Sequence, residues 1–478
     1  GPNSGKDVFV PMEWVIGGQQ QVGQGWKMLM DCLSVGRAIS LPALGAAAGK
    51  ACALTTGAYS RIRRQFRTPI GRFEGIEEAL ARIGGITYRM EAGRLMTAGV
   101  LAQGQKPSVL SAILKYNNTE GMRTVVNAAM DVHAGKAVCR GPANYLNSSY
   151  QTVPVAITVE GANILTRSMI VFGQGAIRCH PYVLQEMLAA ADPDKSRGLA
   201  DFDEALFAHI GFTLSNAVRA LVLGFGGERF LDVPEVGKKG LYLRRISRLS
   251  AAFSFAADVA MLTLGGDLKR REKISGRFAD VLSHLYLASS VIKHHEDAGR
   301  PAEDTALVAW AIEDSLDIAE SRLAEIAANF PVKGVGTLIR LIALPLGRRY
   351  CPPSDRTGAR VARLLIEPGP ARERLTSGLF LELKKSDRVG LLELALQKGI
   401  AAEGLERKVR KATGRHVTPL DYEKPVSDAM AAGAINELEA RALREAMELA
   451  AQVIAVDSFE VIKPAPARGL RPEEARTG

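Results

Sequence analysis

A single carboxylate stands at the end of an apolar run that extends from Val153 to Val159. Glu160 follows this run, and Gly161 follows Glu160. Apolar surroundings disfavour the ionised form of a carboxyl group, which raises its pKa and makes the carboxylate a stronger base once it is ionised. The glycine leaves room for a ligand beside the backbone. From these residues alone two interpretations stay open: a catalytic base, or a surface glutamate that caps a helix.

Other candidate reactive groups are weaker. His294, His295 and Glu296 are consecutive, but adjacent residues of a helix point about 100° apart and no second ligand pair lies at i+4, so no metal site is expected. Ser34 and Ser168 lack a histidine partner and a nucleophile elbow, which argues against acyl hydrolysis. The glycines of residues 224–227 do not form the strand-to-helix fingerprint of a nicotinamide dinucleotide site.

The composition indicates a soluble protein with a sizeable core. The chain has 478 residues, 47% of them hydrophobic and 23% charged, with a formal net charge of +10. The five cysteines follow no pattern, which is typical of a reducing, cytoplasmic compartment. Aromatic residues make up only 6%, which argues against stacking on nucleic acid, and no nucleic-acid partner is expected.

The elements that would position Glu160 are mostly helices. Residues 1–25 are expected to be the end of a β-rich domain, with a strand near Val8–Pro11. Apolar residues at spacings of three and four predict an antiparallel bundle of about four main helices over residues 26–185. Residues 186–463 are expected to form an extra helical domain, and residues 464–478 a flexible tail. The predicted fold class is therefore mainly α, with a short β remnant before the bundle.

The segment 159–167, Val-Glu-Gly-Ala-Asn-Ile-Leu-Thr-Arg, resembles the signature of the acyl-CoA dehydrogenase family. In that signature the glutamate is followed by glycine, and an arginine lies seven residues beyond it; Glu160 and Arg167 match. The resemblance implies that Glu160 removes the α-proton of the substrate and that Gly161 and Arg167 belong to the substrate site.

A stretch upstream, residues 63–73, is similar to the part of the family that contacts the flavin near a subunit boundary. The resemblance implies that Arg63, Gln65 and Phe66 bind the cofactor. The chain departs from the usual pattern at Arg67 and Glu74.

The segment 131–135, Asp-Val-His-Ala-Gly, occupies the place of the family's Gln-x-His-Gly-Gly motif, with Asp131 and Ala134 as departures. The resemblance implies that Asp131 and Gly135 also contact the flavin. Near the start, residues 25–37 resemble the first bundle helix, whose arginine, here Arg37, lies beside the acyl-CoA. Some relatives carry the catalytic glutamate next to that arginine, where this chain has Gly36.

Taken together, the resemblance covers residues 8–185 in the expected order, and the region that follows resembles the extra domain of bacterial long-chain, FadE-type enzymes. The chain is expected to be a carboxy-terminal fragment, since the amino-terminal helical domain and most of the middle β domain of the family are not in it. The resemblance implies oxidation of long-chain acyl-CoA to trans-2-enoyl-CoA, the first step of fatty acid β-oxidation. FAD would accept the β-hydride, because protein side chains cannot. An electron-transfer flavoprotein is the implied electron acceptor, and the implied assembly is a homodimer or an intrachain pseudo-dimer.

Two alternatives to this dehydrogenase stay open, a non-catalytic acyl-CoA-binding module at a membrane surface and an acyl-CoA oxidase. The segment 335–350 is apolar with basic residues at its borders, as in proteins that lie in an anionic membrane interface. We therefore keep a peripheral contact with the inner membrane as a hypothesis for an otherwise cytoplasmic protein.

Overall fold

The computed structural model describes residues 3–234 and 237–459, and in these ranges the chain is mainly α-helical, as the sequence predicts. The only paired strands in the described ranges are β1 (Arg64–Gln65) and β2 (Thr68–Pro69), a short antiparallel hairpin in which Gln65 is opposite Thr68. The sequence-predicted tail, residues 464–478, lies outside the described residues.

The strand expected near Val8–Pro11 is not formed. Residues 3–25 contain the two 3-10 turns η1 (Met12–Trp14) and η2 (Gln19–Gln21), and the side chains of Val8, Phe9 and Val10 are exposed. A strand is stable only when neighbouring strands pair with its backbone, and the described residues offer no such partner to this segment.

The predicted bundle is present. Its long helices are α1 (Gly25–Ala38), α2 (Ser40–Ile62), α3 (Glu74–Ala102) and α4 (Ser108–His133), of which α2, α3 and α4 contact one another extensively. Pro107 precedes α4, where its missing N–H costs nothing. The shorter elements of this region are η3 (Ile70–Arg72), α5 (Gly135–Val138), α6 (Asn147–Thr158), α7 (Asn163–Leu165), the π-helix η4 (Thr166–Gln174) and α8 (Gly175–Cys179).

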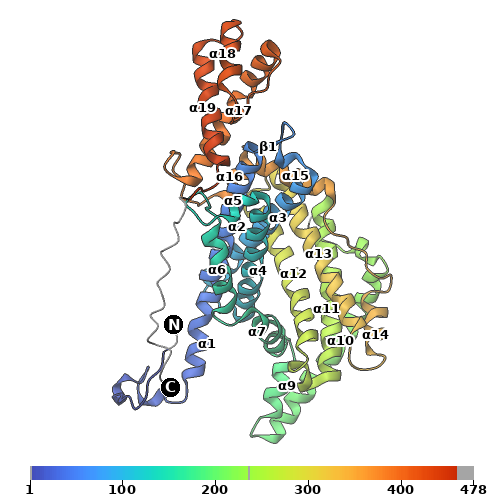
Figure 1. The fold of residues 1–478 in the computed structure, drawn as a ribbon. Helices are drawn as coiled ribbons and strands as arrows, with labels where there is room; N and C mark the ends of the chain where they lie inside the picture. Colours follow the sequence, from blue (N-terminus) through green and yellow to red (C-terminus); the bar gives the residue numbers. More distant parts are fainter. Residues whose placement is uncertain (1–2, 235–236, 460–478) are drawn as a thin grey trace, which may run out of the picture.

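The extra region is helical throughout and packs along the bundle (Figure 1). Its first helices are α9 (Val183–Ala190), α10 (Lys195–Gly224), η5 (Gly227–Phe230), α11 (Gly237–Leu264), η6 (Gly265–Lys269), α12 (Glu272–Asp297), η7 (Ala302–Asp304) and α13 (Thr305–Ala328). They are followed by α14 (Val335–Ala343), α15 (Asp355–Ile366), α16 (Pro370–Thr376), α17 (Arg388–Thr413), α18 (Glu423–Ala431) and α19 (Glu437–Ile454).

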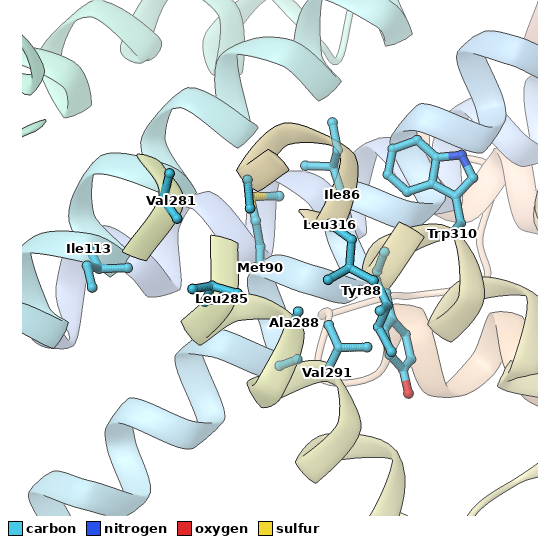
Figure 2. Close-up of a cluster of buried hydrophobic side chains, with 14 of the residues drawn as sticks. Ile86, Tyr88, Met90, Ile113, Val281, Leu285, Ala288, Val291, Trp310 and Leu316 are labelled. Carbon is cyan, nitrogen blue, oxygen red and sulfur yellow. The ribbon is translucent and has the colours of Figure 1, made fainter. Parts of the chain in front are cut away.

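Bundle and extra region share one hydrophobic core. Figure 2 shows Ile86 and Met90 of α3 beside Leu285 of α12 and Leu316 of α13, and the same cluster of buried residues continues into α2 and α15. A Cβ on Gly85 would lie 2.6 Å from Cζ3 of Trp310, so that only glycine allows α3 and α13 to approach this closely. The extra region therefore stabilises the bundle that holds Glu160.

The helices α17, α18 and α19 form a projecting unit at one end of the molecule (Figure 1). Arg64 of β1 donates to Glu406 of α17 at 2.6 Å, and Arg61 of α2 pairs with Glu403. These ion pairs hold the unit against the part of the bundle that contains the flavin-like sequence stretch.

Three helical segments of the described chain are long and apolar enough to cross a membrane, or four if one bent pair counts as a single span. In the apolar 18-residue window of each segment, 67% of the residues are buried within the protein in Val35–Ile62 and 44% in Lys239–Lys269, but only 17% in Lys195–Gly224.

Candidate active site

Glu160 lies in the tight turn between α6 and α7. Its φ is 57° and that of Gly161 is 97°, so two consecutive residues adopt a left-handed conformation. This is unfavourable for a residue with a Cβ, and such strain is found where the surrounding structure fixes a functional side chain. Within the described chain the backbone N–H of Glu160 donates no hydrogen bond, which leaves it available to a ligand.

The end of α1 packs against this turn. Nε of Arg37 donates to the carbonyl oxygen of Glu160 at 2.6 Å, and Arg37 is buried. A Cβ on Gly36 would lie 2.5 Å from Cδ of Glu160, so the carboxyl group occupies the space that a side chain at position 36 would need. The structure thus brings together Arg37, Gly36 and Glu160, as the sequence interpretation requires.

A buried lysine holds the other side of the turn. Nζ of Lys115, on α4, donates to the carbonyl oxygens of Ile157 at 2.9 Å and Gly161 at 2.8 Å and to Oδ1 of Asn163 at 2.7 Å. An ammonium group has three donors, and here all three are used. The hydroxyl of Thr166 also donates to the Gly161 carbonyl, at 3.0 Å. Lys115 therefore fixes the backbone before and after Glu160.

The carboxyl group of Glu160 is held in an unusual electrostatic setting. Burial raises its pKa, while the positive charges of Arg37 and Lys115 act in the opposite direction. Oε2 is buried and has no hydrogen-bond partner within the described chain. Burial, with a smaller contribution from the charge of Arg37, lowers the pKa of Lys115 to about 8. A partly desolvated carboxylate that has one oxygen without a hydrogen-bond partner and lies close to two cations can accept a proton from a ligand bound beside it.

Arg167 lies near this turn but contacts the extra region. It lies in the π-helix η4, a rare element that is frequent at functional sites. Its Nε and Nη2 donate to the two carboxylate oxygens of Asp280, on α12, at 2.7 and 2.6 Å. A Cβ on Gly276 would lie 2.8 Å from Nη1 of Arg167, so glycine makes this approach possible. The described geometry gives Arg167 a role in docking α12, and a contact with substrate stays a prediction.

The flavin-like stretch lines a cavity of about 520 Å³ at the opposite end of the bundle. Arg63, Gln65, Phe66 and Gly135, all predicted cofactor contacts, are among its walls. Nη1 of Arg63 donates to the hydroxyl of Tyr59 at 2.8 Å, which orients the guanidinium, and the ring of Phe66 is 92% exposed. The full set of lining residues is Tyr59, Ile62, Arg63, Arg64, Gln65, Phe66, Arg67, Gly135, Lys136, His416, Val417, Thr418, Pro419, Leu420, Ile454 and Val456.

This lining suits an anionic nucleotide. Four lysine or arginine residues and one histidine are present and no carboxylate, while the remaining walls are largely apolar or aromatic. A diphosphate needs positive charges and donors, and an adenine ring needs apolar or aromatic surfaces. The residues therefore fit the phosphate-bearing end of FAD. Seven of the sixteen lining residues come from the extra region, namely residues 416–420, Ile454 and Val456.

Asp131, the remaining predicted cofactor contact, is exposed at the end of α4 and is not among the cavity walls. Its neighbour His133 is buried, stacked on Tyr59, and hydrogen-bonded to the Ala129 carbonyl and to the hydroxyl of Tyr145. Burial lowers the pKa of His133 to about 4. His133 thus packs behind the cavity wall.

The two clusters lie at opposite ends of α4. Lys115 holds the Glu160 turn, and His133, eighteen residues along the same helix, lies behind the cavity; at a rise of 1.5 Å per residue they are about 27 Å apart. Figure 1 shows α5 and α7 toward opposite ends of α4.

Sequence reasoning missed several of these residues. Lys115 was not singled out, although a lysine among the consecutive buried positions of α4 is a signal of a satisfied internal cation. Lys136 and His416 were missed because nothing local indicates that the extra region folds back onto the flavin-like stretch.

One cluster of potential metal ligands occurs in the described chain, at His180, His209 and Asp258, whose ligand atoms lie within 4.8 Å of one another. Nδ1 of His180 accepts from the backbone N–H groups of Tyr182 and Val183, so its Nε2 carries the proton and donates to Asp258 at 2.9 Å. Both ring nitrogens of His180 and both carboxylate oxygens of Asp258 take part in hydrogen bonds within the protein, and the cluster joins α9, α10 and α11. His294 and His295, considered above, contact the ring of Tyr88 and the carbonyl of Pro301 respectively.

Comparison with known families gives two matches that together cover most of the chain. Residues 177–459 match the model "Acyl-CoA dehydrogenase, C-terminal, bacterial type", and residues 23–173 match "Acyl-CoA dehydrogenase, C-terminal domain". The boundary between the matches falls at the end of the π-helix η4 and within α8.

Individual relatives match shorter parts. The chain is 55% identical to Protein HemX of Proteus mirabilis over 58 residues, which are 12% of this chain and 34% of that protein. It is 26% identical to a 3-(aryl)acrylate reductase of Clostridium sporogenes over 155 residues, 31% of this chain and 39% of the reductase. The chain thus spans well under two thirds of these curated relatives.

Among solved structures, the fold resembles that of a Bacillus anthracis acyl-CoA dehydrogenase complexed with FAD. The TM-score is 0.55 at 17% sequence identity, over 72% of this chain and 57% of that one.

Proposed function

We propose, because the chain belongs to the acyl-CoA dehydrogenase family, that it carries the catalytic base of an enzyme that oxidises long-chain acyl-CoA to trans-2-enoyl-CoA. This reaction is the first step of fatty acid β-oxidation. The observation that carries the proposal is the half-buried carboxyl group of Glu160, which packs over Gly36 with a buried, unpartnered Oε2 and is flanked by Arg37 and Lys115.

In this proposal Glu160 removes the α-proton of the thioester. The α-proton is weakly acidic, so the base must be ionised, poorly solvated and correctly placed. Burial supplies the poor solvation, and the positive charges of Arg37 and Lys115 favour the ionised carboxylate by lowering its pKa. The free backbone N–H of Glu160 is positioned by the left-handed turn to donate to the thioester oxygen, which gains negative charge as the proton leaves. A bound FAD would supply the acceptor for the β-hydride.

Arg37, Gly161 and Arg167 are proposed to form the side of the substrate site that this chain contributes. Arg37 and Gly161 border the Glu160 carboxyl group directly: a Cβ on Gly161 would lie 3.5 Å from Nη2 of Arg37. Arg167 reaches the site only if its bond with Asp280 is exchanged for a bond with the ligand.

FAD is the proposed cofactor, with its phosphate-bearing end in the cavity lined by Arg63 and Lys136. Glu160 and this cavity are about 27 Å apart along α4, so in this proposal the two sites of one chain do not contact the same FAD molecule. A homodimer, or a pseudo-dimer within a longer chain, would bring each flavin between two such surfaces. The electron acceptor is proposed to be an electron-transfer flavoprotein in the cytoplasm.

The decisive experiment is anaerobic addition of palmitoyl-CoA to the complete flavin-loaded protein, with flavin bleaching followed by visible absorbance. The parent should bleach, the Glu160→Gln variant should not, and Glu78→Gln, at an exposed carboxylate of α3, should behave as the parent. Bleaching in the Glu160→Gln variant would move the base elsewhere. A parent that binds flavin and acyl-CoA without bleaching would favour an acyl-CoA-binding module, and rapid reoxidation by air would favour an oxidase.

Flavin binding can be tested separately from the chemistry. Arg63→Met should weaken binding of FAD at least about tenfold, because a charge-assisted bond to phosphate is lost, while Arg82→Met, at an exposed ion pair, should not. Equal affinity in the parent and the Arg63→Met variant would remove this cavity from the proposal.

A further inference from the structure

The long helix α10 turns its apolar side toward solvent. Leu199, Phe207, Ile210, Leu214, Val218, Leu221, Val222 and Phe225 recur at helical spacing and are all exposed, with Phe207 71% and Leu214 63% accessible. A helix on the surface of a soluble protein normally buries such a face. We call these eight residues the α10 apolar face.

Three polar side chains of α10 point inward. His209 is hydrogen-bonded through Nδ1 to the carboxylate of Glu186 on α9, Thr213 donates to the buried Asp258 of α11 at 2.9 Å, and Asn216 is 3% exposed. These bonds, together with extensive packing on α11, tie one side of the helix to the protein. This side of the helix is therefore occupied, and its outer, apolar side is the one that can lie along a membrane.

The α10 apolar face continues onto α14 and the loop after it. A Cβ on Gly224 would lie 2.7 Å from the ring of Pro345, so the two segments touch. Leu338, Leu341 and Leu346 add to the exposed apolar surface there, and Phe230, just after α10, is 89% exposed. Figure 1 shows α10 and α14 on the same side of the molecule, away from the unit formed by α17, α18 and α19.

From Phe207 onward the charges beside this surface are positive, whereas Asp201, Asp203 and Glu204 are exposed near its amino-terminal end. Residues 205–227 contain no aspartate or glutamate, and Arg219 is their only lysine or arginine. Arg219, Arg229 and Arg340 are exposed, and within the described ranges no carboxylate is recorded as an ion-pair partner of any of them. Basic side chains bordering a long apolar face complement a surface that combines hydrocarbon with negative charge, and an anionic bilayer is such a surface.

We propose that the α10 apolar face and the exposed leucines of α14 dock the protein onto an anionic phospholipid bilayer, with both helices lying in the interface. Phe207 and Phe225 are eighteen residues apart, so the part of the face between them is about 27 Å long. Arg219, Arg229 and Arg340 would meet the lipid phosphates. The proposal goes beyond the dehydrogenase chemistry and does not rest on it, and it places on α10 most of a contact that the sequence suggested only for residues 335–350.

The test is flotation of the full chain, without acyl-CoA, with vesicles of phosphatidylcholine that contain phosphatidylglycerol and with vesicles of phosphatidylcholine alone. The parent should float with the anionic vesicles. In the double variant Leu214→Glu, Val218→Glu, partitioning onto the anionic vesicles should fall about tenfold or more. Two apolar side chains that would insert into the bilayer are replaced by negative charges, which the anionic lipid repels. Leu438→Glu, at a 77% exposed leucine of α19 at the other end of the molecule, is the matched control and should float as the parent does.

The electrostatic part is tested by the triple variant Arg219→Gln, Arg229→Gln, Arg340→Gln, which should bind the anionic vesicles more weakly and become insensitive to added salt. A parent that stays unbound with both vesicles would overturn the proposal, as would equal losses for the α10 variant and the Leu438→Glu control. Sedimentation velocity tests the alternative that a second copy of the chain covers this face. A parent that does not bind vesicles, forms a dimer, and becomes monomeric in the Leu214→Glu, Val218→Glu variant would assign the face to a second copy and overturn the proposal.

Discussion

The carboxyl group of Glu160 occupies the space over Gly36, on a different helix 124 residues earlier in the sequence. The neighbouring Arg37 then binds the backbone carbonyl of the same glutamate. The helix α1 thus supplies both the gap that the base needs and the bond that fixes its backbone. This relationship ties the glycine at position 36 to the use of Glu160 as the base.

Gly36→Ala should abolish most activity without unfolding the protein. The added methyl group would lie within 2.5 Å of the Glu160 carboxyl carbon, so the carboxylate must move, and a displacement of about 1 Å can cost about 100-fold in rate. Flavin bleaching by palmitoyl-CoA measures this loss. Gly99→Ala is the matched control, since a Cβ on Gly99 of α3 meets nothing within 4 Å. It should gain up to about 1 kcal/mol from helix propensity and keep full activity.

Lys115→Met should change the pH dependence of the reaction as well as stability. Three acceptors around the Glu160 turn lose their donor, which we expect to cost about 2 kcal/mol of unfolding free energy. The lysine charge lowers the pKa of Glu160, so its removal raises that pKa, and the acid limb of the rate profile should move to higher pH.

Lys50→Met is the control for this experiment. Lys50 of α2 is also largely buried and paired, with Glu91, but it does not contact the turn. The Lys50→Met variant should be less stable than the parent, but the acid limb of its pH–rate profile should not move. If both variants show the same profile as the parent, Lys115 has only a structural role.

The sequence was sufficient for the fold class and for the helical bundle, because helical periodicity carries these. The roles of Glu160 and Arg37 stay predictions from a local motif, and the structure places the two residues in contact. It was insufficient where a partner lies far along the chain. Nothing near Arg167 indicates Asp280, and nothing in residues 63–66 indicates that residues 416–420 cover them.

Two further features depend on what surrounds a segment rather than on its own residues. The period of α10 reveals an apolar face but not whether another element covers it. The β-branched run at Val8–Val10 predicts a strand, but a strand requires a neighbour to pair with, and the described chain provides none there.

The pair Arg167–Asp280 should be an energetic link between bundle and extra region. We expect Arg167→Gln to lower the unfolding free energy by about 2 kcal/mol and Asp280→Asn to lower it by somewhat more, since Asp280 also pairs with Arg322. The double variant should lose clearly less than their sum, because both single changes remove the same partly buried bidentate pair. Urea unfolding of the four proteins gives the coupling energy. The exposed pair Arg82–Glu78 is the control and should show coupling below about 0.5 kcal/mol.

The same variants test the predicted substrate contact of Arg167. If docking is its only role, Asp280→Asn and Arg167→Gln should change KM for acyl-CoA equally. A KM that rises in Arg167→Gln alone would show that the guanidinium binds substrate.

His133 should make the protein less stable in mild acid. Its native pKa is about 4, against 6.5 for an ordinary histidine, because it is buried. Between these values the unfolded chain takes up a proton that the native chain does not, so stability falls as pH is lowered through the window from about 6.5 to about 4. The full effect is about 3 kcal/mol at 1.36 kcal/mol per pKa unit.

Urea unfolding at pH 7 and pH 4.5 should show most of this loss of stability in the parent. His133→Phe keeps the stack on Tyr59 but loses the bonds to Ala129 and Tyr145, so it should be less stable at pH 7 yet lose about 2 kcal/mol less on acidification. An identical acid dependence in parent and variant would mean that His133 takes up its proton as readily in the native protein as in the unfolded chain, contrary to its burial beside Lys136 and Arg63.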